Sequence, residues 1–313
     1  MVMSAFALKE SVRVPQSLLC KAPASMMLFG EHSILREGRA IVSAISKWLS
    51  VKIVSRETET IEVFSSFGKE SCPFTKISLS SRLRFVEAAL QRFSGQLQGG
   101  FSIHIVSEID PTMGLGSSAS VSVAMLMALA AWTGQSWTKE TLLEEAVSLI
   151  RSVQGCGSGA DAASIVYGGV IAFDGKKASP LAPTLPLVSQ YCGYKTPTPH
   201  VVKQVNDREK RLPLLFSSLF STIDAVTEEA ISAIQKEELS CLGGLMNTAD
   251  GLMQALGVGT RELSDLCWRF RNEPSIFGAK ISGSGLGDCV VALGSSKQKT
   301  LPVSVSEQGV VLQ

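Results

Sequence analysis

The stretch that decides the fold of this chain is Asp110-Pro111-Thr112-Met113-Gly114-Leu115-Gly116-Ser117-Ser118-Ala119-Ser120, which leads directly into an apolar segment at 121–132. Glycine lets a backbone turn sharply and approach a ligand closely, because it carries no Cβ atom. Serine is a preferred residue at a helix N-terminus, where unpaired N–H groups and the positive end of the helix dipole attract anions. The stretch therefore predicts a turn and a buried helix whose start binds an anion, most often a phosphate.

This pattern differs from two common nucleotide-binding motifs. No lysine follows Gly114 or Gly116, as a P-loop requires, and Ala119 stands where a dinucleotide-binding fingerprint needs its third glycine. A plain glycine-rich turn before a buried helix is the alternative that the local pattern leaves open.

Composition indicates a well-packed globular protein. The 313 residues are 45% hydrophobic and 18% charged, and the formal net charge of +1 gives no sign of nucleic-acid or membrane-surface binding. The seven cysteines form no C-x-x-C pair, so we expect reduced thiols in a cytoplasmic protein, with Cys156 as a small buried residue. We expect no secretory leader, because Met1 to Leu8 lacks a basic start and a long apolar core. The apolar segment 121–132 is too short to span a bilayer.

Hydrophobic periodicity predicts a mixed α+β chain. The expected strands are 18–28, 40–55, 61–64, 101–106 and 170–173, with a strand and glycine turn over 278–293. The expected helices are 81–93, 121–132, 139–153 capped by Thr138, a helix near His200, 214–233, 241–256 and 262–271. The proline-rich stretch 176–187 predicts a linker, and we place two domains at 1–178 and 179–313.

Three further motifs contain glycines: Gly30-Glu31-His32, the segment 155–161 and the segment 280–287. Together with the loop at 111–119, their order and spacing resemble the GHMP kinases, the family of galactokinase, homoserine kinase, mevalonate kinase and phosphomevalonate kinase. The resemblance covers the chain from Lys21 to about Leu293. It implies a two-domain α+β fold, with an N-terminal ATP-binding domain like ribosomal protein S5 and a C-terminal ferredoxin-like open sheet covered by helices.

The resemblance also implies roles for particular residues. The ATP phosphates would be bound by Pro111, Met113, Gly114, Leu115, Gly116, Ser117, Ser118 and Ala119, with Ser118 also a magnesium ligand. The acceptor substrate would be bound by Glu31, His32, Thr196, Gly283 and Ser284. For His32, orienting the substrate and pinning the loop are both open.

Asp161 is the candidate catalytic base, because the segment 154–169 resembles the corresponding stretch of the mevalonate kinases within the family. A carboxylate near a substrate hydroxyl can take its proton as the oxygen attacks the γ-phosphorus. The alternative for Asp161 is a helix-capping or turn residue.

The chain departs from the family pattern at two positions. Ser25 stands where the resemblance places a lysine near the phosphoryl-transfer centre, and Ile150 stands where it places a glutamate that binds magnesium. The candidates to replace them are lysines 21, 195 and 280 and glutamates 144 and 145.

The function implied by the resemblance is transfer of the γ-phosphate of ATP, with Mg²⁺, to the 5-hydroxyl of mevalonate, a step of isoprenoid precursor synthesis. The expected partner is this small anionic acceptor, with no nucleic acid and no membrane, and a homodimer is left open. Two alternatives remain. A phosphomevalonate kinase fits the two departures better, and a non-catalytic member of the family would bind nucleotide or sugar without turnover.

Overall fold

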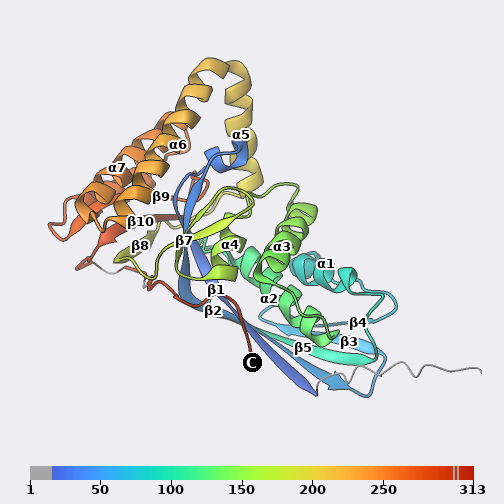
Figure 1. Cartoon of the computed structure of the whole chain (residues 1–313). Helices are drawn as coiled ribbons and strands as arrows, with labels where there is room; N and C mark the ends of the chain where they lie inside the picture. Colours follow the sequence, from blue (N-terminus) through green and yellow to red (C-terminus); the bar gives the residue numbers. More distant parts are fainter. Residues whose placement is uncertain (1–15, 299, 302) are drawn as a thin grey trace, which may run out of the picture.

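The computed structural model describes residues 16–298, 300–301 and 303–313. The segment Met1 to Leu8, where no leader was expected, lies outside the described residues. Figure 1 shows two long, paired strands at the centre, β1 (Ser17–Phe29) and β2 (Ala40–Arg56), with most helices grouped at their two ends. A short 3₁₀ helix, Ser33–Arg36, lies in the connection between these strands.

The remaining elements follow in chain order. The first half contains β3 (Thr60–Ser65), β4 (Gly68–Pro73), a 3₁₀ turn (Ser81–Leu83), α1 (Arg84–Arg92), β5 (Gly100–Ser107), α2 (Ser117–Trp132), α3 (Lys139–Gln154), α4 (Ala160–Tyr167), β6 (Val170–Phe173) and β7 (Ala178–Ala182). The second half contains β8 (Leu187–Tyr191), α5 (Thr198–Arg211), α6 (Pro213–Gln235), α7 (Leu239–Leu256), α8 (Arg261–Arg271), β9 (Ile276–Ser282), β10 (Cys289–Gly294) and β11 (Val311–Leu312).

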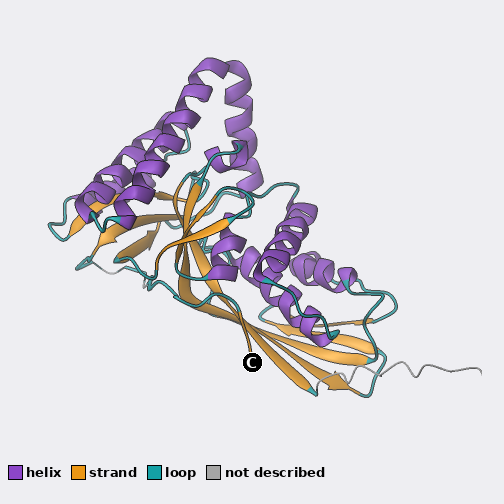
Figure 2. Cartoon of the chain, in the orientation of Figure 1, coloured by secondary structure: helices purple, strands orange, loops and turns teal. Residues whose placement is uncertain are grey.

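A large sheet is built around β1 and β2. Its strand order is β11-β1-β2-β5-β3-β4, and β6 and β7 extend it from the other end of β2. All pairs in it are antiparallel except β3 with β5, which run parallel. Helices α1 to α4 lie on one face of this sheet (Figure 2).

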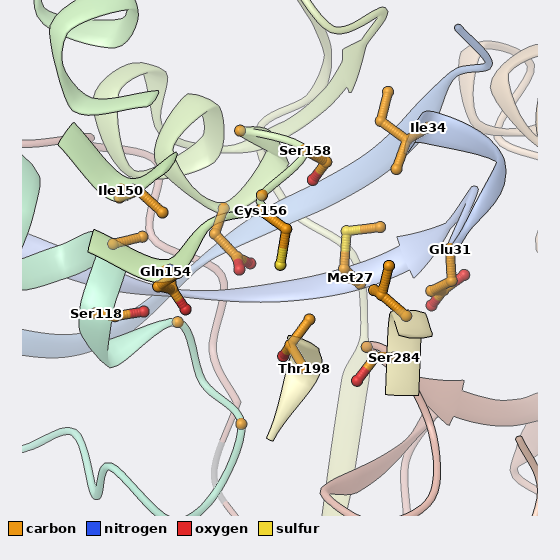
Figure 3. Close-up of a pocket in the computed structure, with 18 of the residues that line it drawn as sticks. Met27, Glu31, Ile34, Ser118, Ile150, Gln154, Cys156, Ser158, Thr198 and Ser284 are labelled. Carbon is orange, nitrogen blue, oxygen red and sulfur yellow. The ribbon is translucent and has the colours of Figure 1, made fainter. Parts of the chain in front are cut away.

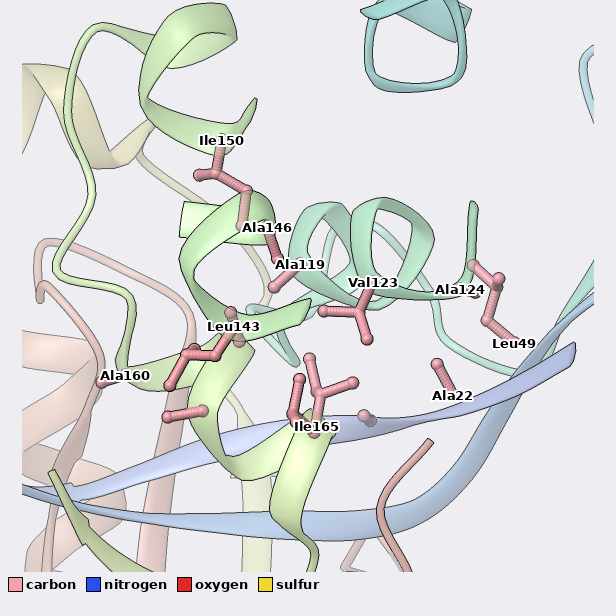
Figure 4. Close-up of a cluster of buried hydrophobic side chains, with 14 of the residues drawn as sticks. Ala22, Leu49, Ala119, Val123, Ala124, Leu143, Ala146, Ile150, Ala160 and Ile165 are labelled. Atoms are coloured by element: carbon pink, nitrogen blue, oxygen red, sulfur yellow. The ribbon is translucent and has the colours of Figure 1, made fainter. Parts of the chain in front are cut away.

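Helix α2 is the core of this half of the molecule. The buried residues of α2 lie on all sides of the helix, which is typical of a central helix rather than of an amphipathic surface helix. Figure 4 shows Ala119 of α2 beside Ala146 of α3, and Val123 of α2 directed toward Ile165 of α4 and Ala22 of β1. The small alanines allow these elements to pack closely, so the start of α2 is held firmly against β1.

The second sheet is antiparallel, with strand order β8-β10-β9. Its core contains side chains of α5, α6, α7 and α8, among them Val205, Phe220, Leu256 and Phe270. This open sheet with its helices confirms the expected fold class.

The predicted strands and helices are confirmed, including the Thr138 cap, whose hydroxyl accepts a hydrogen bond from the Thr141 N–H. Strands β4, β8 and β11 were missed, and the stretch predicted as a linker contains β7. Since β7 pairs with β6 while β8 pairs with β10, sheet membership changes between residues 182 and 187. The domain limits 1–178 and 179–313 stay a prediction.

Two further expectations concern thiols and the membrane. All seven cysteines are free, in agreement with the predicted reduced thiols. Within the described ranges, none of the helices combines the length and apolar character needed to cross a bilayer.

Helix α7 and strand β9 meet through two glycines. A Cβ atom on Gly243 would lie 2.3 Å from the Phe277 carbonyl oxygen, and one on Gly278 would lie 2.0 Å from the Gly243 carbonyl oxygen. Both obstacles are backbone atoms, which cannot move aside cheaply. The contact between helix and sheet therefore requires glycine on both sides.

We expect Gly243→Ala to lower the free energy of unfolding by about 1–3 kcal/mol, because the added methyl group overpacks this contact. Gly244→Ala is the matched control, since Gly244 is exposed in the same helix and a Cβ atom there meets nothing within 4 Å. That variant should be stabilised by about 0.5–1 kcal/mol, the usual gain for alanine over glycine inside a helix. Urea denaturation of both variants measures the difference, and equal stabilities would contradict the packing argument.

Candidate active site

A cavity between the two sheets brings together most of the predicted site residues. Its lining comes from the end of β1, the start of α2, the 154–162 segment, the start of α5 and the β9–β10 loop. The predicted residues that line it are Glu31, His32, Gly114, Gly116, Ser117, Ser118, Ala119, Asp161, Gly283 and Ser284. Figure 3 shows Ser118 and Gln154 on one side of the cavity and Glu31 and Ser284 on the other.

The glycine-serine loop turns directly into α2, as predicted. Gly116 adopts a left-handed conformation at the helix N-cap, with φ of 67°. A Cβ atom there would lie 2.0 Å from the Ser25 hydroxyl oxygen and 3.5 Å from the Asp161 carboxyl carbon. Gly116 therefore lets the glycine-serine loop approach both residues while the N–H groups of α2 remain open to an anion.

Asp161 lies in the first turn of α4 and points into the cavity region. The N-cap of α4 is Gly159, so the capping alternative for Asp161 is wrong. Instead, its carboxylate accepts a hydrogen bond of 2.7 Å from the Ser25 hydroxyl. Burial raises the pKa of Asp161, while this hydrogen bond and the positive charge of Lys195 act in the opposite direction. A carboxylate with a raised pKa is suited to accept a proton near neutral pH.

The turn after β1 is fixed to the β9–β10 hairpin by polar contacts. The side chains of Glu31 and Lys280 form a buried ion pair, and the Lys280 ammonium also donates to the Ile281 carbonyl. His32 Nε2 lies 2.9 Å from the Ser284 carbonyl oxygen, so this nitrogen carries the proton. This contact agrees with the loop-pinning alternative for His32.

Three buried polar atoms around the cavity have no hydrogen-bond partner within the described chain. They are His32 Nδ1, Ser284 Oγ and Asp288 Oδ1. Burial lowers the pKa of His32, which favours the neutral ring and makes Nδ1 an acceptor. Because buried polar groups are nearly always paired, these atoms indicate a polar ligand.

Asp288 and Lys195 face the glycine-serine loop from the second sheet. The Lys195 ammonium lies 3.8 Å from Asp288 Oδ1 and 3.4 Å from the Pro111 carbonyl oxygen. Burial raises the pKa of Asp288 to about 6, Lys195 opposes this shift, and the nearby charge of Asp161 adds to it. Sequence reasoning missed Asp288 because it lies just beyond the glycine loop and carries no motif of its own.

Other predicted residues lie beside the cavity rather than on its wall. Pro111 lines an adjoining cavity. The Leu115 carbonyl accepts a hydrogen bond from the Ser25 N–H, and the Met113 carbonyl accepts one from the Cys289 thiol. The Thr196 hydroxyl donates to the Leu286 carbonyl, and Thr198 lines the cavity in its place.

Cys156 corrects one minor expectation. It is half-buried and lines the cavity, so it is not a filler of the core. No signal in the sequence distinguished it from the other cysteines.

The structure also sorts the candidates for the missing charges. Lys21 lines a separate cavity with Trp48, and Lys280 is held by Glu31, so Lys195 is the lysine that lines the site. Glu144 is exposed on α3 and Glu145 pairs with Arg92, so neither supplies the missing carboxylate.

Comparison with known proteins also points to the GHMP kinases. Residues 83–169 match the GHMP kinases N terminal domain, and residues 230–304 match the GHMP kinases C terminal family. A mevalonate kinase of Pyrococcus horikoshii is 31% identical, with 93% of each chain covered. Among solved structures, L. major mevalonate kinase in complex with R-mevalonate is 27% identical with a TM-score of 0.74, covering 88% of this chain and 87% of that one. The Lin0012 protein from Listeria innocua has a TM-score of 0.84 at 20% identity, covering 95% and 99%, which shows the shared fold alone.

We expect Lys280→Met to lower the free energy of unfolding by about 3–5 kcal/mol, because it leaves the buried Glu31 carboxylate without its partner. Lys203→Met is the control, since the exposed pair of Lys203 with Asp207 contributes about 0.5 kcal/mol or less. Guanidinium denaturation followed by circular dichroism measures both. A loss for Lys280→Met as small as that of the control would show that the buried pair does not stabilise the junction of the sheets.

Proposed function

Since the chain belongs to the GHMP kinase family, we propose that it transfers the γ-phosphate of ATP to the 5-hydroxyl of mevalonate. The observation that carries the proposal is the position of Asp161, whose carboxylate lines the same cavity as the N-terminus of α2. A base and a phosphate-binding helix start on one cavity are the two elements that phosphoryl transfer to a hydroxyl requires.

The nucleotide fits across two adjoining cavities. The second cavity has apolar walls that include Phe85, Val86 and Val121, and it shares Ser117, Ser118, Gln154, Lys195 and Thr198 with the first. Apolar walls suit the base of a nucleoside, and the shared residues include the start of α2, where the phosphates would bind. The γ-phosphate would then point toward Asp161.

The transfer step is a direct displacement. The acceptor hydroxyl oxygen attacks the γ-phosphorus while the bond from that phosphorus to the β–γ bridging oxygen breaks. The proton of the hydroxyl passes to the Asp161 carboxylate, and the products are ADP and the phosphate ester. The N–H groups at the start of α2 stabilise the negative charge on the phosphates throughout.

The acceptor would lie against the turn after β1 and the β9–β10 loop. His32 Nδ1 can accept a hydrogen bond from a hydroxyl, and the Ser284 hydroxyl can donate one to a carboxylate. Glu31 is already neutralised by Lys280 and would act by fixing this wall rather than by repelling an anion.

Magnesium fits the donors present on the cavity. Mg²⁺ is usually held by one or two carboxylates together with substrate phosphates rather than by a cage of protein ligands. The described residues contain no cluster of three metal-binding side chains, but Ser118 and the unpartnered Asp288 carboxylate line the same cavity. When bound, the ion would neutralise charge on the phosphates, with the Ser118 hydroxyl as its predicted ligand.

Phosphomevalonate is the alternative acceptor, and a family member without turnover is the other alternative. The observation that supports phosphomevalonate as an alternative is Ser25, because serine supplies no positive charge where a lysine was expected. We place the reaction in the cytoplasm with a small anionic acceptor, and the homodimer stays a prediction.

The test is ATP consumption with mevalonate, phosphomevalonate, homoserine and galactose. We expect turnover with mevalonate, and Asp161→Asn should lower kcat by about 10²- to 10⁴-fold because the base is lost while the shape is kept. Calorimetry should give a nearly unchanged ATP affinity for this variant. Turnover with another acceptor would correct the substrate, no turnover with any would overturn the enzymatic proposal, and a normal kcat for Asp161→Asn would overturn the assigned base.

Ser25→Ala should shift the acidic limb of the kcat/KM profile to higher pH. The hydrogen bond from Ser25 lowers the pKa of Asp161, so its loss raises that pKa, and the base becomes ionised only at higher pH. Ser43→Ala is the control, because its equally buried hydroxyl bonds to the Ala44 carbonyl instead. An unmoved limb for Ser25→Ala would show that this hydrogen bond does not set the protonation of the base.

A further inference from the structure

We propose that Lys195 binds the γ-phosphate of the nucleotide and is the cation that stabilises the transferred phosphoryl group. This inference rests on the proposed kinase function and names the charged residue that the reaction needs. A transferring phosphoryl group spreads negative charge over its oxygens, and a positive side chain beside them lowers the barrier.

Lys195 is in the right place along the path of the phosphates. Among the described residues that line the main cavity, it is the only lysine or arginine. It also lines the adjoining apolar cavity, so it lies where a nucleotide would pass from one to the other. Its ammonium lies 3.4 Å from the carbonyl of Pro111, the first residue of the phosphate loop.

The backbone around Lys195 is fixed to the β9–β10 loop. The Thr196 hydroxyl donates to the Leu286 carbonyl at 2.5 Å, and the Asp288 N–H donates to the Tyr194 carbonyl at 2.9 Å. A Cβ atom on Gly287 would lie 3.2 Å from the Lys195 Cα atom, so the two loops touch. The backbone that carries Lys195 is therefore held in place, so less conformational entropy is lost when the side chain binds a phosphate.

A structural ion pair with Asp288 does not account for Lys195. The separation of 3.8 Å exceeds a hydrogen bond, and Asp288 Oδ1 keeps no hydrogen-bond partner among the described residues. The side chain of Lys195 is 33% exposed, so its ammonium can turn toward a ligand. Asp161 and Asp288 also place two carboxylates on the cavity, and a bound triphosphate beside them requires positive charge.

Ser25 explains why this charge comes from the second sheet. It is fully buried in β1, and its hydroxyl is committed to Asp161. The loop before α5 approaches the same place from the opposite wall, and Lys195 is the residue of that loop that lines the cavity.

The experiment compares the affinities for ADP and for a non-hydrolysable imido analogue of ATP, both with Mg²⁺, by calorimetry. In the unaltered protein the analogue should bind more tightly than ADP. In Lys195→Met that preference should fall at least tenfold while the ADP affinity stays within about twofold, which also shows that the variant is folded. Lys195→Arg should restore part of the preference, and Lys203→Met, on the exposed face of α5, should leave it unchanged.

A second readout is turnover. Lys195→Met should lower kcat by about 10²- to 10³-fold with a smaller change in the KM of the acceptor. An unchanged preference for the analogue together with a kcat within threefold of normal would overturn the assignment of Lys195 and leave the kinase function standing. If the unaltered protein turns over no acceptor, the proposed function fails. The nucleotide comparison still decides whether Lys195 contacts the γ-phosphate, and equal binding of ADP and analogue by the unaltered protein would overturn that contact.

Discussion

The buried ion pair between Glu31 and Lys280 is the interaction on which the site depends. It joins the turn after β1 to strand β9, and therefore joins the large sheet to the small one. Two further contacts join the same segments. The Ser282 hydroxyl donates to the Met27 carbonyl at 2.8 Å, and His32 contacts the Ser284 carbonyl. Removing one partner of a buried pair leaves an uncompensated charge, so the pair holds the two walls of the cavity together.

Much of the architecture could be predicted from the sequence because its signals are local. The glycines and serines of 114–118 specify a turn and a helix start without help from distant residues, and the period-two pattern of 101–106 specifies a strand. The resemblance to one family then supplied the position of Asp161. The structure places it in the cavity, and its role as base stays a proposal.

The contact between Lys195, which was one of three candidate lysines, and Asp288, which was not predicted, shows where sequence reasoning stops. They are 93 residues apart by their numbering, and they meet because the backbone of Tyr194 pairs with that of Asp288. Such tertiary contacts leave no periodic pattern in either segment. Strand β7 was not predicted because the stretch 176–187 contains three prolines, which are unusual within a sheet. The strand is short and pairs with β6.

The anchoring of Lys195 to the β9–β10 loop has a consequence for how the protein acquires activity. Asp161 and the start of α2 belong to the core packed on the large sheet, whereas Lys195 is carried by the layer built on β8, β10 and β9. Each layer holds only part of the chemistry, and the two share buried contacts, because the core around α2 also includes side chains of α6, α7 and β10. Catalytic competence would then appear last, when the two layers dock, and enzymatic turnover would report on that docking more sensitively than helix or strand content does.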